Sequence, residues 1–129
     1  GDIDLNCTYG SLYFDGISGN VQLNSKYTQV RGTDFEGDFT GKLSYGQLDL
    51  SDTGGDLEVD ARYTALKIDL NNDMNNYQLY CETEYGTINS NLPFQVEERN
   101  NTKYMEGVQG TGEIKINLFS DHADINIYK

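Results

Sequence analysis

The sequence contains only one proline, no tryptophan and no long apolar run. Because no segment approaches the roughly 18 consecutive apolar residues of a transmembrane helix, we predict no membrane span. Basic residues are also scarce: nine lysines and arginines stand against 21 aspartates and glutamates, a formal net charge of −12. Phosphate binding needs clustered lysine and arginine, so this charge argues against nucleic acid and anionic lipid as partners. It is compatible with divalent cations, basic partners or solubility alone.

Residues that commonly carry chemistry are few. Cys7 and Cys81 are too few for a disulfide scaffold and lie in no CxxC or Cys/His context, so we expect small apolar core thiols. The single histidine, His122, has no second His or Cys with which to bind a metal. A triad of Ser120, Asp121 and His122 would lie within one bend, where the three side chains cannot converge. We therefore expect His122 to be an exposed turn residue and the protein not to be an enzyme.

The sequence does contain an 18-residue repeat. Its first 72 residues form four rows (1–18, 19–36, 37–54 and 55–72), and each row opens with Gly-Asp or Gly-Asn. A fixed short period without helical periodicity is typical of a solenoid or stacked β-array. The ninth place of each row is a tyrosine, and another follows after a four-residue slip at 71–76; these are Tyr9, Tyr27, Tyr45, Tyr63 and Tyr85.

Apolar and polar residues alternate within each row. The third place, for example, is Ile3, Val21, Phe39 and Leu57. After the tyrosine the parity changes, which predicts a bend and a second inward-facing strand. Gly10 and Gly46 at the bend could supply a positive φ, while threonine occupies this place in the other two rows. The tyrosines share parity with the core positions, so we expect them on the inner face, stacked about 4.8 Å apart, rather than as an aromatic platform for sugars.

The second half of the chain repeats less regularly. Rows five and six span 77–92 and 112–129, and the sixth row lacks the tyrosine, as expected of an end coil. Between them, the insertion 93–111 begins at the only proline, and its Arg99–Thr102 turn predicts a hairpin. No segment convincingly predicts a helix.

These patterns predict a single all-β domain over residues 1–129. We expect a right-handed β-solenoid of about six 18-residue rungs, with a 36-residue coil left open, and an antiparallel β-sandwich as the alternative. In the solenoid Cys7 and Cys81 lie about four rungs apart, near 19 Å, which is too far to form a disulfide.

Repeated Gly-Asp-x-x-Leu/Val units, the Tyr-Gly-x-Leu bend and the closing Gly112-Glu-Ile-Lys-Ile-Asn and Ala123-Asp-Ile-Asn-Ile strands carry a resemblance. Over residues 1–92 and 110–129 the chain resembles the adhesin-like β-solenoid families of bacteria, extracytoplasmic proteins of unknown function that are frequent in Bacteroides-type genomes. The resemblance implies a β-helix-like fold, export, and residence in the periplasm, on the outer membrane surface or outside the cell. The opening Gly1-Asp2 without a signal peptide fits a mature region. The resemblance implies no catalytic motif.

Three groups of residues could bind a ligand. Glu58 and Asp60 lie in the row before Glu82 and Glu84, on an outward-facing strand face that could contact carbohydrate. The insertion loop lies outside the repeat, so it could carry specificity; its residues are Arg99, Asn100, Asn101, Lys103 and Tyr104. Aspartates in register could supply oxygens to calcium, but the Gly-Gly-x-Gly-x-Asp motif is absent and such aspartates are ordinary turn residues; they are Asp2, Asp15, Asp34, Asp38, Asp52, Asp56 and Asp69.

We therefore expect a non-enzymatic extracytoplasmic module for adhesion or assembly that needs no cofactor. Its partner would be a protein or glycan at the cell surface, or a second copy paired through an end rung with unpaired backbone. The alternatives are a carbohydrate-binding or carbohydrate-active domain that uses the acidic face, and a calcium-stabilised β-roll.

Overall fold

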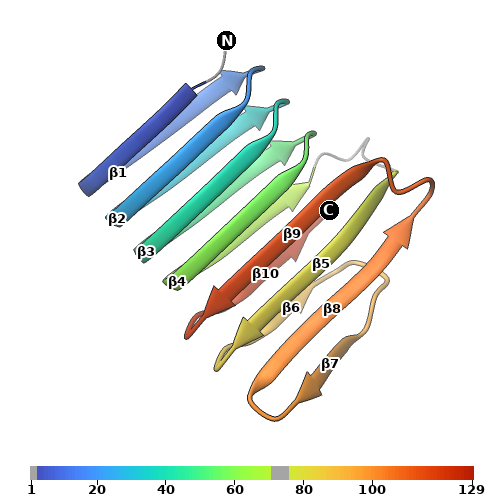
Figure 1. Ribbon diagram of the computed structural model, residues 1–129. Coiled ribbons are helices and arrows are strands. Elements are labelled where there is room, and N and C mark those ends of the chain that lie inside the picture. Colours follow the sequence, from blue (N-terminus) through green and yellow to red (C-terminus); the bar gives the residue numbers. More distant parts are fainter. Residues whose placement is uncertain (1–2, 71–75) are drawn as a thin grey trace.

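The computed structural model describes residues 3–70 and 76–129, and it is built entirely of strands and their connections (Figure 1). The strands are β1 (Ile3–Ile17), β2 (Val21–Phe35), β3 (Phe39–Thr53), β4 (Leu57–Leu70), β5 (Tyr77–Glu84), β6 (Ile88–Ser90), β7 (Val96–Arg99), β8 (Thr102–Gln109), β9 (Ile114–Asp121) and β10 (Ile125–Tyr128). These residues contain no helix, and hence none long and apolar enough to cross a membrane.

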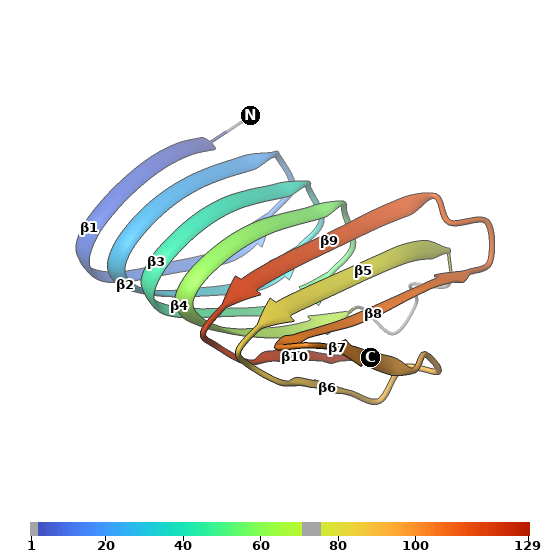
Figure 2. The ribbon, with the colours of Figure 1, turned by 60° about the horizontal axis from the view of Figure 1, so that its bottom comes forward.

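The first four strands are stacked in parallel with an offset of one row. Ile3 pairs with Val21, Val21 with Phe39, and Phe39 with Leu57, so each coil is 18 residues long. Each strand bends in its middle, which gives a first limb before the bend and a second limb after it (Figure 2). Neighbouring repeat strands are parallel, which confirms the solenoid-like all-β fold and excludes the antiparallel sandwich.

The bend is made by the tyrosines themselves, all in the left-handed conformation. Their φ angles are 65° at Tyr9, 53° at Tyr27, 59° at Tyr45, 51° at Tyr63 and 60° at Tyr85. A left-handed residue interrupts the alternation of side chains. The tyrosine ring therefore points away from the core, towards solvent. The prediction that the tyrosines face inward is therefore wrong: their exposed fractions run from 48% to 73%. The prediction that they stack is confirmed, with ring centroids 5.0–5.1 Å apart in the first four rows.

In rows two and four the residue after the tyrosine fills the inside of the bend. Thr28 and Thr64 are buried there, and their hydroxyls donate hydrogen bonds to the carbonyls of Lys26 at 2.8 Å and Arg62 at 2.9 Å. In the intervening row this place is Gly46, where a Cβ would lie 2.1 Å from the carbonyl oxygen of Thr28. Glycine at position 46 thus provides room for the neighbouring rung rather than a positive φ.

Apolar side chains of both limbs meet in one core between them. Two glycines interrupt the apolar columns, and larger neighbours occupy the space that they leave. A Cβ on Gly41 would lie 2.7 Å from the ring of Phe39, and one on Gly32 would lie 2.8 Å from a methyl group of Leu50. The core is therefore closely packed even at the glycines, because a larger side chain nearby fills the space that each glycine leaves.

The spatial order of the rungs differs from their order in the chain. The sheet runs β1-β2-β3-β4-β9-β5-β8-β7, and β10 lies between β4 and β6 on the second limb. The last row is therefore not an end coil, as predicted, but the fifth rung. It separates row four from row five, so Cys7 and Cys81 lie five strand spacings apart instead of four, roughly 24 Å. Both cysteines are free.

The insertion forms the predicted hairpin at the end of the stack. β8 pairs antiparallel with β5, and β7 pairs antiparallel with β8 around a turn at Asn100 and Asn101. Asn100 has a φ of 56°, a left-handed turn conformation that asparagine tolerates well. The predicted slip at 71–76 falls almost wholly on 71–75, outside the described residues.

Substitution of two glycines tests the packing at the bend. In Gly46→Ala the added Cβ would overlap the Thr28 carbonyl, so we expect the free energy of unfolding to fall by about 1–3 kcal/mol. Gly54→Ala is the matched control, because nothing lies within 4 Å of a Cβ at that position. Urea denaturation of both variants measures the difference; equal stabilities would contradict the close stacking of rungs at the bend.

Candidate functional site

The outer face of the first limb gathers aromatic and acidic side chains around the inserted strand β9. Phe119 pairs across β9 with Asp60 of β4 on one side and with Glu82 of β5 on the other. Glu82 in turn pairs with Tyr104 of β8. We call this surface the acidic–aromatic face; it consists of Glu58, Asp60, Tyr80, Glu82, Glu84, Tyr104, Glu106, Phe119 and Asp121.

Strand alternation explains why these side chains point outward. Leu79, Cys81 and Thr83 of β5 are buried in the core, so the residues between and after them, Tyr80, Glu82 and Glu84, lie on the other side of the sheet. The same parity applies to β4 and β9. Phe119 is the exception to the polar character of this face, and 39% of it is exposed.

Two shallow hollows adjoin the central aromatic residues. A hollow of about 540 Å³ is lined by Tyr80 and Glu106 with Lys115, and a second of about 230 Å³ is lined by Asp60, Glu82 and Phe119 among others. The ring centroids of Tyr80 and Phe119 lie 5.7 Å apart at a tilt of 44°. The face thus offers two adjoining aromatic rings bordered by carboxylates.

The local potential of the face is negative. Partial burial raises the pKa of Tyr80, and the carboxylates of Glu82 and Glu106 add to the effect. A hydrogen bond with Glu97, supported by the charge of this carboxylate, raises the pKa of Tyr104. Both phenols therefore remain protonated at neutral pH. Tyr80 can donate a hydrogen bond to a ligand, whereas the single phenol proton of Tyr104 is donated to Glu97.

The predicted acidic group is brought together, but not as neighbouring rows. Glu58 and Asp60 share the outer face with Glu82 and Glu84, yet β9 lies between the two pairs because the last row is inserted there. Sequence reasoning missed Phe119 for the same reason. The signal for it is a large apolar residue at an outward place in an alternating strand.

The predicted loop residues are divided between the two sides of the hairpin. Tyr104 and Arg99 share the outward parity of Glu82, since Tyr104 faces Glu82 and Arg99 faces Thr102. Lys103 pairs with Thr83, whose side chain is buried, so Lys103 has the opposite parity. Asn100 and Asn101 form the turn, and the carbonyl of Asn101 accepts the Tyr85 amide at 2.9 Å.

The stacked rings at the bend form a second aromatic feature, the aromatic column: Tyr9, Tyr27, Tyr45, Tyr63, His122 and Tyr85. His122 stacks between Tyr63 at 4.9 Å and Tyr85 at 4.8 Å, and its φ of 61° matches that of the tyrosines. His122 therefore takes the place of the tyrosine in the last row. The sequence carries a signal for this, because His122 precedes Ile125-Asn126 by the same spacing as Tyr85 precedes Ile88-Asn89. Because neighbouring rings cover one another's faces, the interior of this column offers no flat platform for a sugar.

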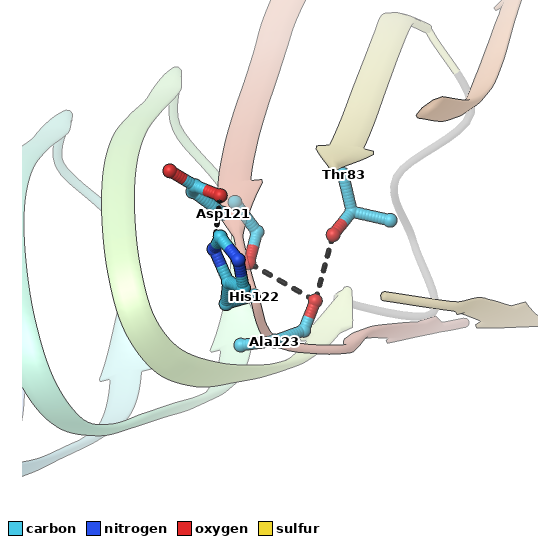
Figure 3. A network of polar contacts seen from close by, with 5 residues as sticks. Thr83, Asp121, His122 and Ala123 are labelled. Atoms are coloured by element: carbon cyan, nitrogen blue, oxygen red, sulfur yellow. Dashed lines mark hydrogen bonds and ion pairs between the residues drawn. The ribbon is translucent and has the colours of Figure 1, made fainter. Parts of the chain in front are cut away.

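Polar contacts hold the histidine rung in place (Figure 3). His122 Nδ1 lies 2.5 Å from Asp121 Oδ1. Behind the ring, the hydroxyls of Thr83 at 2.7 Å and Ser120 at 3.2 Å both donate to the carbonyl of Ala123. Ser120 points to the core side, away from His122, so the three bend residues do not form a catalytic triad.

The Asn and Asp side chains that open the rows accept backbone hydrogen bonds. The side-chain oxygen of Asn20 accepts the Asp38 amide, that of Asp38 accepts the Asp56 amide, and that of Asp56 accepts the Lys115 amide, at 3.2, 2.9 and 2.9 Å. Each row start therefore holds the next rung in register. Within residues 3–70 and 76–129, no three or more His, Cys, Asp or Glu side chains are grouped to hold a metal ion.

The stack of bent strands, with its 18-residue repeat along almost the whole chain, agrees with one comparison. A family model described as Toastrack DUF4097 matches residues 1–128. The chain belongs to the Toastrack DUF4097 family. No curated protein and no solved structure matches the chain. The family description names no activity for a Toastrack domain, so function has to be argued from the surfaces described above.

The two cysteines differ in reactivity. Burial raises the pKa of the Cys81 thiol from its usual 9.0 to about 12, whereas Cys7 is half-exposed on the first strand. We expect one thiol to react with a thiol reagent at pH 8 in the native protein and two to react in denaturant. Mass spectrometry of the labelled peptides identifies the site, and fast native labelling of Cys81 would contradict the packing.

Burial of Cys81 also makes stability depend on alkaline pH. Its folded pKa lies above its unfolded value, so the neutral thiol contributes fully below pH 9.0 and the contribution is lost as pH rises towards about 12. We expect urea-unfolding free energies to fall over this range, and to fall less in Cys81→Ala, which has no thiol to ionise. Parallel pH profiles for the two proteins would show that Cys81 is not responsible.

Proposed function

We propose that this Toastrack domain is a non-enzymatic, adhesin-like binding module and that the acidic–aromatic face is its recognition surface. The observation that carries the proposal is the position of Phe119, an exposed ring between Asp60 and Glu82 and next to Tyr80. An exposed aromatic on an otherwise polar sheet face costs solubility and contributes nothing to the core. The support comes from the contact of Phe119 with Tyr80, because adjoining aromatic rings bordered by polar residues are typical of a binding surface whereas a single exposed ring is not.

The chemistry of the face suits a neutral carbohydrate. Aromatic rings pack against the apolar faces of sugar rings, and carboxylates accept hydrogen bonds from vicinal hydroxyls. The Tyr80 phenol, protonated at neutral pH, can donate to ring and hydroxyl oxygens, and the Tyr104 oxygen, whose proton is donated to Glu97, can accept from a sugar hydroxyl. The two adjoining hollows extend over β4, β9, β5 and β8, which suits a ligand of more than one sugar unit.

A binding role is favoured over hydrolysis by the exposure of the carboxylates. Glu58, Asp60 and Glu84 are exposed, and Glu82 is half-buried. Glycosidases place one carboxyl group in an apolar environment as the general acid, whereas three of these four side chains are exposed to solvent.

An extracytoplasmic location belongs to the same proposal. Its support is the resemblance to exported adhesin-like solenoids, and a surface ligand of this kind would be met there. Accessibility of the protein to an added protease on intact cells tests the location, and protection in intact and outer-membrane-permeabilised cells would contradict it.

Glycan-array binding, followed by calorimetry on the strongest glycan, tests the function. We expect Phe119→Ala to weaken binding at least about tenfold, which corresponds to about 1.4 kcal/mol, because it removes the central ring. Glu82→Gln should weaken binding to a smaller extent by removing one strong acceptor. The matched controls are Tyr13→Ala and Glu36→Gln, exposed residues away from this face, which should bind as the unchanged protein does.

Salt dependence separates a sugar from a basic partner. Binding of a neutral glycan should change little between low and high salt, whereas a cationic peptide on the same face would be released by salt. Absence of glycan binding, or equal loss in Tyr13→Ala and Phe119→Ala, would contradict the proposal.

A further inference from the structure

The first rung differs from all the others, because β1 has a strand on one side only. Among the described strands, its single partner is β2. Its apolar residues Ile3, Leu5 and Leu12 are half-exposed, whereas their equivalents in β2, Val21, Leu23 and Val30, are 1–2% exposed. The end of the stack therefore presents both an unpaired backbone edge and the open end of the apolar core.

This edge lacks most of the features that usually prevent strands from pairing. Edge strands are commonly protected by lysine, proline, a bulge or short length. β1 is 15 residues long, contains no Lys, Arg or Pro, and pairs with β2 in one continuous register. Its only charges are Asp4 and Asp15, both at exposed places.

The opposite end of the stack is closed. There the hairpin turns the edge antiparallel, and the outermost strand β7 has only four residues, including Glu97, Glu98 and Arg99. A short, charged strand cannot continue a 15-residue bent edge. Head-to-tail stacking of copies into a fibre is therefore disfavoured, and β1 is the only long unpaired edge among the described strands.

We propose that two copies of this chain form a closed dimer through an antiparallel β1–β1 pairing. The two limbs of β1 run in opposite directions relative to the bend, from Ile3 to Thr8 and from Ser11 to Ile17. A twofold axis along the line that bisects the bend exchanges the limbs and reverses the stack. Each first limb then meets the second limb of the other copy as an antiparallel strand, and both bent edges are paired over residues 3–14.

The alternation of side chains limits the register of this pairing. Inward residues have odd numbers in the first limb and even numbers in the second limb as far as Phe14, so paired positions within this part must have an odd sum for core to face core. In the register that places Leu5 opposite Leu12 of the second copy, Ile3 faces Phe14 and Asp4 faces Tyr13. The half-exposed apolar residues Ile3, Leu5 and Leu12 then become buried.

Tyr9 lies where the twofold axis would cross the bend. It is 73% exposed, against 48–50% for Tyr27, Tyr45 and Tyr63, because Tyr27 covers only one face of its ring. In the dimer the Tyr9 ring of the second copy would cover the other face. The aromatic column would then run without a break through both copies.

Edge-blocking variants test the pairing by sedimentation velocity over a range of concentrations. Ile3 donates its amide to Asn20, so the amides of alternate residues, including that of Asn6, point to the free edge. We expect the unchanged protein to be dimeric at about 100 µM, a concentration that populates complexes with micromolar Kd. Asn6→Pro, which removes an edge donor, and Leu5→Lys, which places a charge at the core end, should be monomers. Asn6→Ala keeps the backbone donor and should remain a dimer.

A disulfide cross-link tests the position of the twofold axis. This test does not depend on whether the edge variants fold. In a Cys7→Ser background, where serine is already the residue of the second row, Tyr9→Cys should form a disulfide-linked dimer under mild oxidation. Tyr45→Cys is the matched control, since it lies at the same exposed bend three rungs into the stack and should not cross-link. Circular dichroism confirms that each variant is folded.

Three results would overturn the proposal. One is a monomer at about 100 µM for the unchanged protein, which would mean that the β1 edge is not used between copies at micromolar affinity. Another is a dimer that persists in both Asn6→Pro and Leu5→Lys, which would place the interface elsewhere. The third is equal cross-linking of Tyr9→Cys and Tyr45→Cys. None of these results depends on glycan binding, so the dimer and the proposed function can fail separately.

Discussion

The left-handed backbone at the bend is the constraint on which the rest of the structure depends. A bulky residue in this conformation costs about 1–2 kcal/mol, and the fold accepts this cost in six rungs, five times at tyrosine and once at His122. Ring stacking returns about 0.5–1.5 kcal/mol for each pair, and it is available only when all rungs bend at the same height. Strain and stacking together therefore fix the register. A rung that slipped by one residue would keep the backbone strain and lose the ring stacking.

The bend also decides which side chains belong to the core. Without it, alternation would continue past the tyrosine and the second limb would present its polar residues inward. With it, both limbs direct their apolar residues to the same interior, and the threonines at the bend satisfy their hydroxyls on local carbonyls. A thin, two-sided core is thus obtained from strands that individually have only one apolar face.

Local periodicity was enough to predict the repeat, the limbs, the hairpin and the ring stacking, because these depend on residues within one row or its neighbour. The direction of the tyrosine rings was not predictable by parity, since a single left-handed residue reverses it without changing the sequence pattern. The place of the last row was not predictable either. The sequence of Ile114–Asp121 does not indicate whether this strand pairs with both β4 and β5 or with β5 alone. Its place between them is determined by long-range pairing. The acidic residues were identified, but Phe119 acquires its neighbours only through that pairing.

The insertion of the last row between rows four and five has a consequence for biosynthesis. During translation the first four rungs can assemble as they emerge, since each new row finds its partner already in place. Row five cannot reach its final place beside them at that stage, because β9, the strand that lies between it and β4, is made after it. Until then, the β4 edge and the hairpin unit are two separate half-structures with exposed apolar ends. The last two strands, β9 and β10, connect the two parts of the domain. A chain whose synthesis stopped before them would therefore give two unconnected parts rather than a shorter stack.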